Sequence, residues 1–158
     1  MARLSAGVLL YRRTGGSVEV LLAHPGGPFW AKRDEGAWSI PKGEYDDGTD
    51  PAAAALREFR EETGHDPPAG EWISLGSARQ KGGKIVVAWA VEGDLDVTAA
   101  SSNRFTMEWP PRSGRTQEFP EIDRWGWFDL PAARAKILPG QAEFLDRLAE
   151  ELSSSPRS

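Results

Sequence analysis

The segment from Asp50 to Gly64 carries the strongest structural signal in the chain. Asp50 is a residue type that caps helices, Pro51 suits the first helical position, and Ala52–Ala55 are strong helix formers. Gly64 is placed to end the helix, and Pro67-Pro68 prevent its continuation. The sequence therefore predicts a helix between Asp50 and Gly64.

Three glutamates share one face of this predicted helix. At about 100° per residue, Glu62 lies roughly 40° to one side of Glu58, and Glu61 lies roughly 60° to the other. Carboxylates three and four residues apart repel each other, and a divalent cation relieves that repulsion. Mg²⁺ prefers oxygen ligands and often binds between carboxylates and substrate phosphates. The face predicts a metal site, with a solvated acidic surface as the alternative.

The composition limits the chemistry and the location that fit the chain. Its 158 residues correspond to one domain. With no cysteine and two histidines, at positions 24 and 65, it lacks the residues for a thiolate zinc site or a cysteine nucleophile. No apolar run approaches the roughly 20 residues that span a membrane, and the N-terminus lacks the pattern of a secretory signal. We therefore expect a cytoplasmic protein with no membrane partner.

The net charge limits the ligands. The chain carries 19 lysines and arginines against 24 acidic residues, a formal charge of −5. This balance disfavours a long nucleic acid, whose binding depends on neutralised phosphates, but a small phosphorylated ligand needs only a local cationic cluster. Lys42, Lys81 and Lys84 are candidates for phosphate contacts. The turn that holds the last two is equally consistent with a solvated hairpin.

The seven tryptophans divide into two groups. Trp30, Trp38 and Trp109 are candidate surfaces on which a nucleobase of the substrate stacks, with packing in the core as the alternative for each. The other four lie in strand-like runs and are expected in the core: Trp72, Trp89, Trp125 and Trp127.

Strand patterns flank the predicted helix on both sides. A second, amphipathic helix is expected over Pro139–Leu152, and Gly93–Glu118 has few periodic features and is expected to be irregular. The order of strands, helix, strands and helix favours a mixed sheet with helices packed on it. We expect one domain over residues 1–152 and a disordered tail over 153–158. The expected strands are Leu4–Arg12, Val18–His24, Ala37–Ile40, Trp72–Gln80, Lys84–Glu92 and Trp125–Leu130.

The residues around the first helix resemble the Nudix box, G-x5-E-x7-R-E-U-x-E-E-x-G-U, where U is bulky and apolar. The matching positions are Gly43, Arg57, Glu58, Phe59, Glu61, Glu62 and Gly64. Two positions depart from the box, because Thr49 replaces its first glutamate and His65 its last apolar residue. The run Trp-Ser-Ile-Pro-Lys-Gly at 38–43 is most similar to the branch that hydrolyses dinucleoside polyphosphates such as diadenosine tetraphosphate. The sequence is thus identified as a member of the Nudix superfamily.

The resemblance implies a fold and an activity. The fold is an α/β/α sandwich, with a mixed β-sheet between helices. The activity is hydrolysis, with Mg²⁺ or Mn²⁺, of a pyrophosphate bond in a nucleoside diphosphate linked to another moiety, such as a dinucleoside polyphosphate or a nucleoside triphosphate. The alternative is a non-catalytic nucleotide-binding domain, for which Thr49 is the argument. The protein is expected to be a monomer or a homodimer.

The resemblance also implies roles for particular residues. Glu61 and Glu62 are metal ligands together with the carbonyl of Gly43, and Glu58 is a further ligand or the base for the attacking water. Arg57 orients a glutamate through a charge-assisted hydrogen bond. Outside the box, Glu121 lies where the dinucleoside polyphosphate branch places a catalytic glutamate. Glu118 is the second candidate for that position, and for each of the two the alternative is an ordinary carboxylate in a polar loop.

Overall fold

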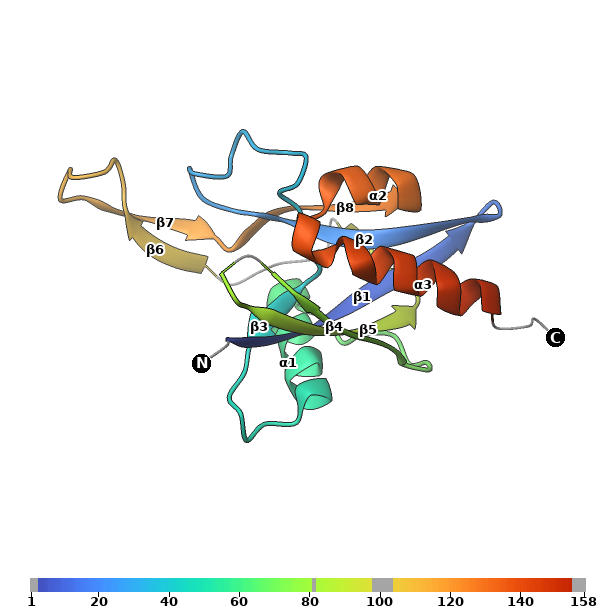
Figure 1. Ribbon diagram of the computed structural model, residues 1–158. Coiled ribbons are helices and arrows are strands. Elements are labelled where there is room, and N and C mark those ends of the chain that lie inside the picture. Colours follow the sequence, from blue (N-terminus) through green and yellow to red (C-terminus); the bar gives the residue numbers. More distant parts are fainter. Residues whose placement is uncertain (1–2, 81, 98–103, 155–158) are drawn as a thin grey trace.

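A mixed sheet forms the centre of the computed structural model, which describes residues 3–80, 82–97 and 104–154 (Figure 1). Its strand order is β4-β5-β1-β2-β8, and β3 pairs with β1. The β1–β5 pair is parallel and the other pairs are antiparallel. The strands are β1 (Leu4–Thr14), β2 (Ser17–Pro25), β3 (Lys42–Glu44), β4 (Ile73–Arg79), β5 (Ile85–Glu92) and β8 (Ile122–Asp129).

Helices cover both faces of this sheet. The helices are α1 (Pro51–Thr63), α2 (Leu130–Lys136) and α3 (Ala142–Ser154), the last preceded by a 3₁₀ turn at Pro139–Gln141. Successive residues of β1 point to opposite faces: Leu10 packs in a cluster with Phe59 of α1, whereas Leu9 packs in a cluster with Phe144 of α3. The expected α/β/α sandwich with a mixed sheet is confirmed.

The first helix has the ends that its sequence predicts. The Asp50 side chain accepts a hydrogen bond from the Ala53 amide at 3.2 Å. Gly64 adopts a left-handed conformation, with φ of 78°, and its amide donates to the carbonyl of Arg60 at 2.8 Å. Helix α1 therefore begins after Asp50, at Pro51, and ends with Gly64 as its C-terminal cap, as the sequence predicts. Every helix in the described ranges is too short or too polar to cross a membrane.

Several elements differ from the expected ones. The stretch expected to be irregular contains an antiparallel hairpin of β6 (Arg104–Glu108) and β7 (Thr116–Pro120). The expected strand at Ala37–Ile40 is reduced to single bridges at Trp38 and Ser39. Helix α2 had no periodic signal because it is only seven residues long. Helix α3 continues to Ser154, two residues into the expected tail, and residues 155–158 lie outside the described ranges.

Strand β3 positions the functional segment against α1. It pairs with the start of β1, where Gly7 lies opposite Lys42 and Ala6 opposite Gly43. A Cβ atom at Gly7 would lie 2.8 Å from the Cβ atom of Lys42, so only glycine permits this close approach. Residue 43 therefore lies directly beside the acidic face of α1.

Candidate functional site

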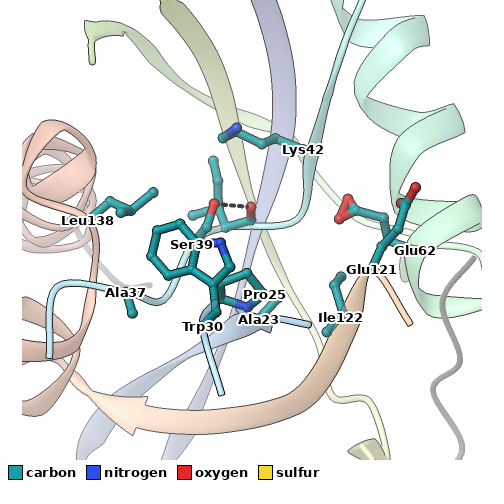
Figure 2. Close-up of a pocket in the computed structure, with 11 residues that line it drawn as sticks. Ala23, Pro25, Trp30, Ala37, Ser39, Lys42, Glu62, Glu121, Ile122 and Leu138 are labelled. Carbon is teal, nitrogen blue, oxygen red and sulfur yellow. Dashed lines mark hydrogen bonds between the residues drawn. The ribbon is translucent and has the colours of Figure 1, made fainter. Parts of the chain in front are cut away.

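A pocket of about 230 Å³ opens between α1, β3 and the start of β8 (Figure 2). Its charged lining residues are Lys42, Glu62 and Glu121, which come from three segments far apart in the sequence. Figure 2 shows the carboxyl groups of Glu62 and Glu121 on one side of the pocket and Lys42 on another. The remaining lining residues are Ala23, Pro25, Trp30, Ala37, Ser39, Ile40, Ile122 and Leu138.

Burial and neighbouring charges both disfavour the ionised form of Glu62 in this pocket. Its Oε2 atom is buried and accepts no hydrogen bond from any residue that the structure describes. Burial raises the pKa of Glu62 well above its usual 4.5, the charges of Glu58 and Glu121 raise it further, and Lys42 opposes them. A buried oxygen without a partner costs free energy, so Glu62 is arranged to accept a cation or a proton.

Glu58 is held between an arginine and a glycine. Arg57 Nη2 donates to Glu58 Oε1 at 3.4 Å, and the Glu58 side chain is only 16% exposed. On the other side, a Cβ atom at Gly43 would overlap the Glu58 carboxyl group. Burial raises the pKa of Glu58, as does the charge of Glu61, whereas Arg57 lowers it. The contacts place the expected orienting arginine and the expected glycine on either side of this carboxylate.

Gly43→Ala tests that arrangement. The new methyl group must displace the Glu58 carboxyl group, so we expect metal affinity to fall by about 10–100-fold, as when a partner that orients a ligand is lost. The three atoms nearest to the new methyl group all belong to the flexible Glu58 side chain, so the fold is expected to remain. Calorimetric titration with Mn²⁺ measures the effect. Gly48→Ala is the matched control, since a Cβ atom there meets nothing within 4 Å among the described residues. Equal affinities in the two variants would contradict the prediction.

Two lysines lie close enough to influence each other. Burial lowers the pKa of Lys42, and the charge of Lys84 lowers it further, while Glu62 and Glu58 oppose the shift. Lys84 stands just before β5, and its carbonyl accepts from the amide of Gln80 at 2.7 Å. The structure thus brings together two of the three candidate phosphate-contacting lysines. The third, Lys81, lies outside the described residues.

Glu121 and Glu118 have different surroundings. Glu121 lies between β7 and β8 and lines the pocket, and its carbonyl accepts from the amide of Gly26 at 2.8 Å. Glu118 Oε1 instead accepts from Arg104 Nε at 2.6 Å, across the β6–β7 hairpin. Of these two glutamates, Glu121 is therefore the one that lies beside Glu62.

The acidic residues do not form a preassembled metal cluster. In the described parts of the chain, no three aspartate, glutamate, histidine or cysteine side chains converge closely enough to hold an ion. Glu61 is exposed to solvent, and it acts on Glu58 through its charge. The unpartnered Oε2 atom of Glu62 and the Gly43 cradle nevertheless fit a cation that draws these carboxylates together.

Trp38 does not fit the stacking role expected for it. Its side chain is 6% exposed, its indole N–H donates to Asp34 Oδ1 at 2.8 Å, and its ring meets Phe128 and His24 edge to face. With its faces covered, the indole has no open surface for a base. Trp30 lines the pocket instead.

Four tryptophans pack partly buried against the core cluster around Phe59, as expected: Trp72, Trp89, Trp125 and Trp127.

Two residues that line the pocket, Ser39 and Leu138, were not expected from the sequence. Ser39 lies within the run at 38–43 but matched no expected role, and Leu138 is brought beside this run by the hydrogen bond from its amide to the carbonyl of Trp38 at 2.8 Å.

Curated proteins similar to this chain carry the name RNA pyrophosphohydrolase. One from Rhodospirillum rubrum is 30% identical over 158 residues, which cover 95% of this chain and 92% of the relative. One from Gluconacetobacter diazotrophicus is 32% identical over 112 residues, covering 68% of this chain and 63% of the relative. The chain thus spans less than two thirds of the second relative. The expectation of a pyrophosphohydrolase agrees with these names.

Solved structures show the same fold. The binary complex of a C. elegans Ap4A hydrolase superposes with a TM-score of 0.66 at 22% identity and covers 98% of this chain and 100% of its own. The NUDIX domain of Shewanella oneidensis NrtR, complexed with ADP ribose, gives 0.62 at 17% identity, covering 96% and 89%. The family model of the NUDIX domain matches residues 1–148. The chain therefore belongs to the Nudix family.

Proposed function

We propose that the protein hydrolyses a pyrophosphate bond in a nucleotide-type substrate, with Mg²⁺ or Mn²⁺. The observation that carries the proposal is the buried, unpartnered Oε2 atom of Glu62 beside Glu58 and Glu121. A divalent cation gives this atom a partner, and when bound it neutralises phosphate charge and favours attack by water. A solvated acidic surface does not explain a carboxylate oxygen that is buried.

The carboxylates have distinct roles in this proposal. Glu58, Glu61 and Glu62 hold the metal together with the carbonyl of Gly43. Arg57 keeps the Glu58 carboxylate in place, which its 3.4 Å contact supports. Glu121 accepts a proton from the attacking water, because it is the glutamate outside the helix that lines the pocket.

The lysines complete the site on the substrate side. Lys42 lines the pocket opposite the carboxylates, and Lys84 lies within electrostatic reach of it. Two neighbouring cations suit a polyphosphate, which carries several charges in a short length. We propose that Lys42 and Lys84, with Lys81, bind the phosphates of the substrate.

Two classes of substrate fit this proposal. A dinucleoside polyphosphate or a nucleoside triphosphate fits the formal charge of −5, since a small ligand needs only the local lysines. The 5′ end of an RNA is the second candidate, because the curated relatives bear the name RNA pyrophosphohydrolase. A non-catalytic nucleotide-binding domain is the rival class, because Thr49 replaces an acidic residue of the box.

A substrate panel tests the proposal. The panel contains dinucleoside polyphosphates, nucleoside triphosphates, nucleotide sugars, diphosphoinositols and 5′-triphosphorylated RNA, each with Mg²⁺, Mn²⁺ or a chelator. We expect metal-dependent product release from at least one member, at least about 100-fold faster than with the chelator. Tight nucleotide binding without turnover of any member would favour the non-catalytic domain.

A further inference from the structure

The β6–β7 hairpin and Glu121, which follows it, contact the loop after β2 next to the pocket. The amide of Gly26 donates to the carbonyl of Glu121 at 2.8 Å, and a Cβ atom at Gly27 would lie 3.0 Å from the ring of Phe105. Further along the loop, Phe29 meets Trp109 edge to face, with ring centroids 5.4 Å apart. Figure 1 shows this hairpin projecting from the central sheet. The hairpin is thus fastened to the loop that also supplies Trp30 to the pocket.

Phe29 is exposed in a way that packing does not explain. The residue is 61% exposed, and no other large hydrophobic residue in the described ranges is comparably open. The phenyl ring contacts Trp109 edge to face, and the rest of its surface is open to solvent. An open aromatic ring beside a second aromatic ring is suited to a nucleobase, because every base has a face that stacks.

The hairpin is cationic in an otherwise acidic chain. Residues 104–120 hold three arginines and two glutamates, whereas the whole chain has a formal charge of −5. Glu118 forms an ion pair with Arg104. The Glu108 carboxylate accepts hydrogen bonds from the backbone amides of Arg112 and Gly114. No described residue forms an ion pair with the side chain of Arg112 or Arg115. Two exposed guanidinium groups are therefore available to a phosphate.

We infer that Phe29, Trp109, Arg112 and Arg115 form a hairpin surface that binds a second nucleotide unit of the substrate. The base stacks on Phe29, and the arginines bind the phosphate of that unit, while the reacting pyrophosphate lies in the pocket. The inference rests on the proposed function and specifies its substrate as one that carries two bases. A dinucleoside polyphosphate and the 5′ end of an RNA share this chemistry.

Phe29→Ala tests the inference on substrates with one base and with two. The substrates are a nucleoside triphosphate, diadenosine tetraphosphate and a 5′-triphosphorylated dinucleotide, and KM and Kd are measured for each. We expect Phe29→Ala to raise the ratio of two-base to one-base KM about tenfold, the effect of losing one stacked base. Arg112→Ala/Arg115→Ala is expected to raise the same ratio and to weaken its salt dependence. Arg134→Ala is the control, since that arginine lies on α2 and pairs with Asp146.

The outcomes distinguish the binding of a second nucleotide unit from the proposed hydrolysis itself. A changed ratio for only one of the two-base substrates supports the inference and identifies the source of the second base. An unchanged ratio overturns the inference while leaving hydrolysis intact. If the wild-type protein hydrolyses none of the substrates, the proposed function fails, and the ratio of Kd values still decides whether the second base is bound. A change of oligomeric state in Phe29→Ala with unchanged ratios would assign the surface to a second copy of the chain.

Discussion

Glu62→Gln is expected to abolish turnover and, at the same time, to make the metal-free protein more stable. Loss of a residue that only orients a metal ligand typically costs 10–100-fold, so loss of a ligand carboxylate should cost more than about 100-fold. The gain in stability has a different origin. Glutamine keeps the shape of the side chain but removes a charge that the pocket buries without a partner for Oε2.

The gain depends on pH in a direction that the pKa shift determines. Because the folded state raises the pKa of Glu62 above the usual 4.5, its favourable contribution is complete below that value. It is lost as pH rises through the folded-state pKa, since the buried carboxyl group then ionises. The wild-type protein should therefore lose stability relative to Glu62→Gln as pH rises from acid to neutral, and the two should converge in acid.

Thermal unfolding with and without Mn²⁺ measures both effects. At neutral pH without metal, we expect the Tm of Glu62→Gln to exceed that of the wild type by at least about 2–4 °C, the shift produced by about 1 kcal/mol in a chain of this size. Mn²⁺ should raise the Tm of the wild type and leave the variant nearly unchanged. Glu150→Gln is the matched control, because Glu150 is exposed on α3. A metal-free variant less stable than the wild type would contradict the explanation.

The parts of the site that the sequence predicted are those that depend on local spacing. Gly43, Arg57, Glu58 and Glu62 lie in one strand–loop–helix segment, and the β1–β3 pairing brings the strand and the helix together as the box requires. The cap, the terminal glycine and the helical period are local signals, so they were sufficient for α1.

The parts that the sequence missed depend on long-range contacts. The β6–β7 hairpin forms by pairing across an exposed stretch, where alternation gives little signal because few of its side chains are buried. The indole of Trp38 is covered by Phe128 of β8 and His24 of β2, two elements to which its own segment gives no pointer. A tryptophan that was a candidate for stacking on the substrate is therefore a core residue, through partners that its own neighbourhood does not indicate.

Glu121→Gln and Glu118→Gln form a pair that separates a catalytic glutamate from a structural one. The two residues are three positions apart, and the sequence made Glu121 the first candidate and Glu118 the second. In the structure, Glu121 lines the pocket and raises the pKa of Glu62, whereas Glu118 pairs with Arg104 on the hairpin. If Glu121 accepts the proton of the attacking water, its loss should lower kcat by about 10²–10⁴-fold. An exposed ion pair contributes about 0–1 kcal/mol, so Glu118→Gln should change kcat less than about twofold.

Metal binding and thermal unfolding distinguish proton transfer from a loss of the site. With Glu121 as the base, Glu121→Gln should bind Mn²⁺ as tightly as the wild type while its kcat falls, because Glu121 is not one of the proposed metal ligands. Both variants should keep the fold, because the hydrogen bond from Gly26 goes to the backbone carbonyl of residue 121 and the ion pair of Glu118 is exposed. Turnover that survives in Glu121→Gln would transfer the role of base to Glu58, which also lies beside Glu62 and has a raised pKa.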